Sequence, residues 1–279
     1  MKWRKLWRTA GMVVLIAFAV VFLYPFVIQI AGSFKSEAGA ANDPLSPIPH
    51  PFTIAASFAK LFNGTTDFPL WTLNSVIVTV SVTAGRVLFD SLAGYALARL
   101  RFPGRRVLFA FVIAVLAVPP VVLLIPRFLV LNQLGIYDTY SAMILLLVAD
   151  ASGVFIMKQF FESVPVSVEE AARIDGASTF RIYWSVVLPM ARPALITLTI
   201  LAFQASWNEF TNMLVSVQSP SLYTLPRGLA DLVSGSLGAG TQYPLKLAAA
   251  LLATVPVAIV FVVFQRYFVR GANEGSERG

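Results

Sequence analysis

Carboxylates and arginines gather in the segment from Glu169 to Pro189, EEAARIDGASTFRIYWSVVLP, within a chain that is 57 % hydrophobic. Paired carboxylates can act as general acid and base, so this segment is a candidate active site. Catalysis is disfavoured because no histidine lies near, and Glu170 and Asp175 fall on different faces of a helix. The spacing favours a docking element, with a solvated connector as the plainer alternative.

The same segment predicts a short helix from Val168 to Gly176. Ser167 and Glu170 have the spacing of a capping box, and Glu169 precedes Arg173 by four residues, the favourable order for a charged pair. Gly176 can take the left-handed conformation that ends a helix.

Nine residues make a helix that is marginal in water, so this helix needs a surface to pack against. Ala171 and Ala172 are small and allow a partner to approach the backbone closely. Glu170 and Asp175 offer carboxylates to that partner's basic groups. After a second helical piece from about Ser178, Pro189 is expected to break the run.

Ionisable residues within apolar stretches form a second group, since such residues usually pair or face water. Arg86 and Asp90 are four residues apart, which favours a structural ion pair over a role in a pathway. Asp150 lies beside small residues in VADASG and fits either role.

The motif SWNEF is the better candidate for contact with a substrate. Sugar sites combine an aromatic ring with amides and carboxylates. Trp207, Asn208, Glu209 and, one turn later, Asn212 supply that set. The alternative, equally weighted, is that these side chains only satisfy and pack against neighbouring helices.

The elements that must position these residues are apolar helices. Only 13 % of the 279 residues are charged, too few to cover a soluble domain. Six stretches approach the length of about twenty residues that crosses a bilayer. We expect an all-α integral membrane protein, a single transmembrane domain over residues 1–279, with spans at about 10–31, 73–97, 107–125, 140–161, 191–217 and 247–268.

The distribution of basic residues predicts the orientation of these spans. With both termini in the cytoplasm, 15 of the 21 lysines and arginines lie on that side. Five lie outside: Lys35, Lys60, Arg127, Arg227 and Lys246. The loop of residues 162–190 then faces the cytosol, between the fourth and fifth spans.

Several classes of function are disfavoured by what the sequence lacks. Without cysteine and with His50 as its one histidine, the chain offers no thiolate or histidine metal site. No phosphate-binding loop motif occurs, so any nucleotide is bound elsewhere. The net charge of +7 is spread over short segments, which argues against nucleic acid. A proton-coupled transporter using Asp150 and Glu209 stays open, and an intramembrane hydrolase using Asp90 and Asp150 lacks a paired-aspartate motif.

The segment EEAARIDGASTFRIYWSVVLP resembles the EAA loop of ABC-importer permeases. The family pattern is Glu-Ala-Ala, three residues, Gly, nine residues, a branched apolar residue, one more, then Leu-Pro. The matching positions are Glu170, Ala171, Ala172, Gly176, Val186, Leu188 and Pro189. More of the chain, from about Leu73 to Gly271, is similar to the maltose-type sugar permeases through LNSVIVT, GYALARLRFPGRR, LGIYDTYSAMIL, ASWNEF and FVVFQRYFVRG.

This resemblance implies a bacterial inner-membrane permease with six transmembrane helices and a cytoplasmic coupling helix. It implies a second similar permease, two ATPase subunits that use ATP and Mg, and an external solute-binding protein; the chain itself would bind no cofactor. It leaves a non-sugar solute such as glycerol phosphate open. The ending GANEGSERG departs from the family's lysine-containing tail, which puts tail contacts with the ATPases in doubt.

Overall fold

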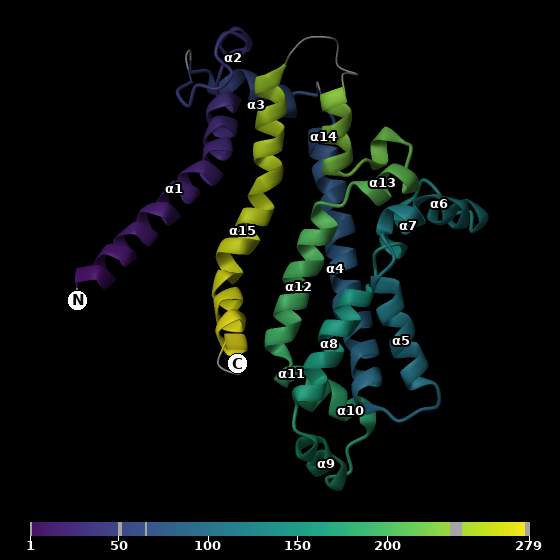
Figure 1. The fold of residues 1–279 in the computed structure, drawn as a ribbon. Helices are drawn as coiled ribbons and strands as arrows, with labels where there is room; N and C mark the ends of the chain where they lie inside the picture. Colours follow the sequence, from purple (N-terminus) through teal and green to yellow (C-terminus); the bar gives the residue numbers. More distant parts are fainter. Residues whose placement is uncertain (1, 50–51, 65, 235–241, 277–279) are drawn as a thin grey trace. The chain divides into compact units, whose positions relative to one another are not determined.

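The structure, a computed structural model, describes residues 2–49, 52–64, 66–234 and 242–276 (Figure 1). This part of the chain is helical and contains no strand, apart from one isolated bridge between Lys35 and Phe52. The prediction of an all-α chain is confirmed for it. The chain divides into two compact units, Met1–Pro69 with Gly228–Val255, and Leu70–Arg227 with Pro256–Gly279.

The first unit contains long apolar helices and a short polar cap. The apolar side chains of α1 are exposed from Met12 to Val27, as expected where lipid or another protein covers a helix. Between α1 and α3 the buried Lys35 ammonium donates to the carbonyls of Asp43, at 2.6 Å, and Ser46, at 2.9 Å. His50, expected in this loop, lies outside the described residues. The helices are α1 (Lys2–Ser33), α2 (Glu37–Asn42), α3 (Ile54–Phe62) and the start of α15 (Tyr243–Ser276).

The second unit is built around α4. Helix α8 packs against both α5 and α12, and α4 meets α8 at Gly94, where a Cβ would stand 2.7 Å from the Cβ of Met157. The helices are α4 (Phe68–Arg99), α5 (Arg105–Leu116), η1 (Pro120–Leu123), α6 (Leu124–Gln133), α7 (Tyr140–Leu145), α8 (Ala151–Ser163), α9 (Val166–Ile174), α10 (Thr179–Ile182), the π-helix η2 (Tyr183–Val187), α11 (Leu188–Met190), α12 (Arg192–Trp207), α13 (Thr211–Ser216), η3 (Pro220–Leu222) and α14 (Leu225–Ser234), which runs into the first unit.

Three described helices are long and apolar enough to cross a membrane, at Thr9–Ser33, Phe68–Arg99 and Tyr243–Gln265. The number rises to five if each of two bent pairs counts as one span: Arg105–Leu116 with Pro120–Gln133, and Thr179–Met190 with Arg192–Trp207.

The unbroken helices expected at 107–125, 140–161 and 191–217 are each interrupted. The first breaks before Pro120, since proline has no N–H to donate and disfavours a helical residue before it. The second breaks between α7 and α8, where Asp150 caps a new helix, and the third breaks between Trp207 and Thr211. The mean apolarity of a long stretch does not register such breaks, because one or two prolines or polar residues change it little.

Asp138 fastens two loops of the second unit together. Its backbone has φ of +60°, its N–H donates to the Ser216 carbonyl at 2.9 Å, and its carboxylate accepts the N–H groups of Gln218 and Ser219, each at 2.9 Å. The Ser219 hydroxyl also donates to this carboxylate. These bonds, the hydroxyl of Ser219 first, hold the pKa of Asp138 below its usual range.

Replacing Asp138 should loosen this junction. Asp138→Ala removes the acceptor for three donors, and we expect a loss of about 1–2 kcal/mol in unfolding free energy at pH 7. Because the folded pKa is lowered, the contribution is present above the ordinary pKa of aspartate and is lost as the pH falls through the folded value. Unfolding midpoints in detergent between pH 7 and pH 3 check this. Asp43→Ala, at an exposed side chain, is the control, and equal midpoints for the two variants would contradict the assignment.

Candidate functional site

The short helix predicted after the fourth apolar stretch is present as α9, at Val166–Ile174. It starts two residues earlier than expected, with Pro165 at its N-cap and no side-chain capping hydrogen bond, so the predicted capping box of Ser167 and Glu170 is wrong. Ser167 lies inside the helix and not at its N-cap, and residues 165–167 are exposed, so solvent can satisfy the free N–H groups of the first turn.

The expected end of α9 is confirmed. Gly176 has φ of +78°, its N–H donates to the Arg173 carbonyl at 3.0 Å, and the Ala177 N–H donates to the Ala172 carbonyl at 3.0 Å. This pair of bonds is a Schellman motif, which needs a residue that tolerates the left-handed conformation. The predicted second helical piece also follows, with Ser178 capping α10.

A buried ion pair fixes α9 to the last turn of α4. Glu169, whose side chain is 3 % exposed, lies 2.9 Å from Nε of Arg99, whose side chain is 9 % exposed. The Tyr95 hydroxyl donates to the same carboxylate at 3.2 Å, and Arg99 also donates to the Val164 carbonyl. The predicted partner, Arg173, reaches Glu169 only at 4.0 Å and is half-exposed. Sequence reasoning missed Arg99 and Tyr95, which lie some seventy positions before Glu169.

The ion pair of Glu169 with Arg99, the anchor of α9, divides this helix into an inner and an outer face. Ala172 is half-buried and packs with Ala177 and Leu188 on the protein's own core cluster around Tyr95 and Ile182. This contact corrects the expectation that both alanines face a partner. The outward side chains are Glu170, Ala171, Arg173, Asp175 and Ile174, the last 87 % exposed. Pro189 is exposed beyond η2.

A groove of about 480 Å³ runs between α9 and the end of α4. Glu169, Glu170 and Arg173 line it from α9, and Arg99, Arg101 and Arg105 line it from the other side. Figure 1 shows α9 beyond the ends of α4 and α8. The exposed side chains of α9, which are acidic, basic and apolar, are held in place by the ion pair with Arg99 and form a candidate docking surface.

Two charged residues of α4 form hydrogen bonds with backbone groups at the break between α7 and α8. The expected ion pair of Arg86 with Asp90 is not present in the described structure: Arg86 donates to the Leu147 carbonyl at 2.7 Å, and Asp90 accepts the Asp150 N–H at 3.0 Å. The carboxylate of Asp150 caps α8 by accepting the N–H groups of Ser152 and Gly153. Each charge therefore replaces a backbone partner that the broken helix has lost.

The four residues around SWNEF lie at the break between α12 and α13. Trp207 is buried and stacks on Phe203, with ring centroids 5.8 Å apart. The exposed Asn208 donates to the Gln204 carbonyl at 3.0 Å, and Glu209 accepts the Asn212 N–H at 2.8 Å.

Asn212, which is buried, also accepts a hydrogen bond of 2.5 Å from Arg127 of α6, a partner that sequence reasoning missed. All four predicted residues therefore have structural contacts within the chain. The Asn208 side chain and the second oxygen of Glu209 keep the capacity to bind a further group.

Chemical catalysis finds no support in this arrangement. No group of three or more His, Cys, Asp or Glu side chains among the described residues could hold a metal ion. The carboxylates of Glu169, Asp90 and Asp150 are each engaged with an arginine or with backbone N–H groups.

Comparison with known proteins identifies the group to which this arrangement belongs. Residues 90–274 match the family described as binding-protein-dependent transport system inner membrane component. The chain belongs to this family. It is therefore a permease, a non-catalytic membrane subunit of an ABC transporter, and subunits of this kind generally work with another permease, ATPases and a binding protein.

Relatives match this permease over almost its whole length. The arabinooligosaccharides transport system permease protein AraQ of Halalkalibacterium halodurans is 34 % identical over 95 % of this chain and 93 % of its own. The sn-glycerol-3-phosphate transport system permease protein UgpE of Yersinia pestis is 31 % identical over 93 % of each. A solved bacterial ABC transporter for import of the acidic polysaccharide alginate matches with a TM-score of 0.82 and 27 % identity, covering 95 % of this chain and 97 % of that one.

The anchor of α9 generates a stability prediction for the permease. Glu169→Ala leaves the buried Arg99 guanidinium without its carboxylate, and removal of one partner of a buried pair costs about 3–5 kcal/mol. We expect a lower unfolding midpoint and, because the damage is local to α9, faster proteolytic cleavage within residues 164–176. Limited proteolysis with peptide mapping measures the second effect.

Glu170→Ala is the matched control, since it removes a neighbouring but exposed carboxylate and should change stability by less than about 0.5 kcal/mol. Equal cleavage rates for the two variants would show that Glu169 does not hold α9.

Proposed function

We propose that this permease forms half of the transmembrane pathway of an ABC importer for a sugar or an oligosaccharide. In this proposal the chain acts as one permease domain that crosses the bacterial inner membrane six times with both termini in the cytoplasm. A second permease completes the pathway, two cytoplasmic ATPases use ATP and Mg, and an external binding protein delivers the solute. The observation that carries the proposal is the geometry of α9, a short helix fixed on one face and open on the other.

The relatives support a carbohydrate as the solute. Two of the proteins described above are named for arabinooligosaccharide and alginate transport, and both match more than nine-tenths of the chain. The glycerol phosphate permease keeps a small phosphorylated solute as the alternative.

The six-span topology requires the interrupted stretches to cross as broken helices. Non-helical backbone is tolerated at membrane depth only where its polar groups are satisfied. Arg86 and Asp90 provide this for the break between α7 and α8, and Arg127 contacts the segment after α12. The excess of basic residues on the side of α9 supports a cytoplasmic position for that helix.

Coupling to the ATPases is proposed for α9, through Glu170, Ala171, Asp175 and Gly176, with Leu188 and Pro189 in the loop behind it. Ala172 contributes by letting α9 sit close to the core. A motion of the ATPases against the outer face would reach α4 through the pair of Glu169 and Arg99, which are 2.9 Å apart.

An autonomous proton-coupled mechanism is less well supported. It requires Asp150 and Glu209 to take up and release protons, whereas both side chains accept N–H groups at the start of a helix. Protonation of either carboxylate would weaken these bonds.

The coupling proposal is tested in the assembled importer. Glu170→Lys reverses the charge on the outer face of α9, and we expect loss of ATPase co-purification and at least about a tenfold fall in solute uptake, equivalent to about 1.4 kcal/mol of contact energy. Gly176→Val should act similarly, because a β-branched residue is strained at positive φ.

Asp43→Lys, an equal charge change at an exposed position of the first unit, is the control and should retain uptake. The proposal fails if Glu170→Lys and Gly176→Val both retain ATPases and uptake at the level of this control. Flux through the purified chain alone under a pH gradient would support the proton-coupled mechanism instead.

The proposed pathway residues Trp207, Asn208, Glu209 and Asn212 are tested through Asn208, which is exposed. Asn208→Ala should raise the solute concentration for half-maximal uptake several-fold, because the amide that would bind a hydroxyl group of the sugar is lost. Protein level and ATPase binding should stay the same. Asn132→Ala is the matched control, since that exposed side chain also donates to a carbonyl four residues earlier. Identical uptake curves would remove Asn208 from the pathway.

A further inference from the structure

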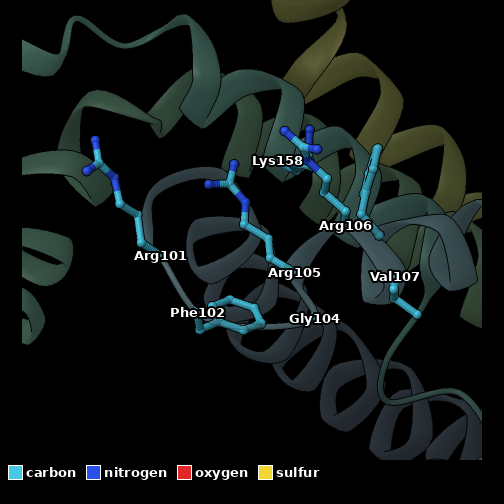
Figure 2. A pocket seen from close by; sticks show the side chains of 8 residues that line it. Arg101, Phe102, Gly104, Arg105, Arg106, Val107 and Lys158 are labelled. Carbon is cyan, nitrogen blue, oxygen red and sulfur yellow. The ribbon is translucent and has the colours of Figure 1, made fainter.

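A basic cavity of about 620 Å³ lies where α4 turns into α5. Its cationic lining consists of Arg101, Arg105, Arg106 and Lys158, and Phe102 and Val107 lie beside them. Figure 2 shows the guanidinium groups of Arg101 and Arg105 turned to the same side of the loop, away from the Phe102 ring. The cavity shares Arg101 and Arg105 with the groove beside α9 but is otherwise separate from it.

The positive charge of this cavity is only partly compensated. Lys158, which is 7 % exposed, lies 2.8 Å from Glu162 and 4.0 Å from the centre of the Phe109 ring. Arg105 lies 3.9 Å from the same carboxylate and donates to two carbonyls at the end of α4. Neither Arg101 nor Arg106 makes an ion pair or a side-chain hydrogen bond within the described part of the chain. Among the four cations, Glu162 therefore reaches only Lys158 and Arg105.

The start of α5 adds to this excess. Gly104 at the N-cap provides no side-chain acceptor, and the first turn of this 12-residue helix carries Arg105 and Arg106 but no acidic residue. Cations at a helix N-terminus are unfavourable, because the free N–H groups there already present positive partial charge. An anion in the cavity would relieve both the helix end and the arginines.

The apolar neighbourhood decides which kind of anion fits. Along α5, directly after the arginines, Val107 is 73 %, Leu108 52 % and Phe111 66 % exposed. A ligand that fills the cavity and covers this face must carry a negative head group and a long apolar portion. Because α5 belongs to a proposed span, these side chains face acyl chains, and an anion carried by a lipid reaches the cavity from within the bilayer.

We propose that the cavity binds the phosphate group of an anionic phospholipid whose acyl chains lie along α5. The head group contacts Arg101, Arg106 and the N-terminal turn of α5, and Lys158 holds the floor of the cavity positive. The site is independent of the solute that the permease carries, and its position beside the α9 groove links lipid occupancy to the shape of the docking region.

The test uses the full chain in nanodiscs of phosphatidylcholine that contain increasing fractions of phosphatidylglycerol. Native mass spectrometry of protein released from these discs counts the retained lipid. Each basic residue near an anionic surface contributes about a fivefold change in binding, so Arg101→Gln with Arg106→Gln should weaken phosphatidylglycerol retention by about 25-fold. Arg181→Gln with Arg192→Gln removes the same charge from exposed positions outside the cavity and should weaken retention less; an equal fall in both double variants would mean general attraction to the membrane surface and would overturn the site.

Three further measurements distinguish the possible outcomes. A photoactivatable phosphatidylglycerol added to the unaltered protein should label peptides within residues 100–116, and labelling confined to other segments would overturn the proposal. Inorganic phosphate at millimolar concentration should not displace the lipid; full displacement would make the cavity a site for free phosphate. Loss of ATPase binding in Arg101→Gln with Arg106→Gln, with unchanged lipid retention, would assign the arginines to protein docking.

Discussion

The fold depends on one constraint: every backbone group released by a helix break in an apolar chain needs a partner, because neither lipid nor an apolar core supplies one. Helix α4 meets much of this need in its unit. Asn74 donates to the carbonyls of Ser221 and Tyr223, each at 2.9 Å, while Ser75 accepts the Leu225 N–H at 2.7 Å. Farther along, Arg86 and Asp90 serve the break after α7. The polar residues of this apolar helix are thus the reason that its neighbours can be irregular.

The same arrangement connects α4 to the proposed docking face of α9. At the end of α4, Tyr95 and Arg99 hold Glu169, so the element that leaves the helix bundle is fixed to the element that organises it. The inner face of α9 is completed by small residues and a glycine stop, which keep the helix short and close to its support. An EAA-type motif can therefore be understood as two layers, with one face fixed within the permease and the other available to a partner.

The sequence predicted those features that depend on neighbouring residues, such as helix ends and apolar helices. The stop at Gly176, the second helical piece from about Ser178 and the apolar character of α1, α4 and α15 follow from neighbouring residues, and the structure has each of them. The pairing of charges did not follow, because the partners are distant: Arg86 contacts residue 147, Arg99 contacts Glu169, and Arg127 contacts Asn212. Helix spacing suggested the nearer pairs of Arg86 with Asp90 and Glu169 with Arg173. In the structure Arg86 and Asp90 are bonded to the broken backbone, and Glu169 lies 2.9 Å from Arg99 while keeping the predicted Arg173 as a second partner at 4.0 Å.

The length of α4 gives its end contacts a mechanical meaning. A helix of 32 residues is about 48 Å long and resists bending, so it behaves as a strut. Its first turns carry Asn74 and Ser75, bonded to the segment that leads into α14, and its last turn carries the α9 anchor. A displacement of α9 along the axis of α4 would therefore move the segment before α14, and a displacement of that segment would move α9. Force can therefore pass between the two ends of the permease along a single helix, without a relay of small side-chain adjustments.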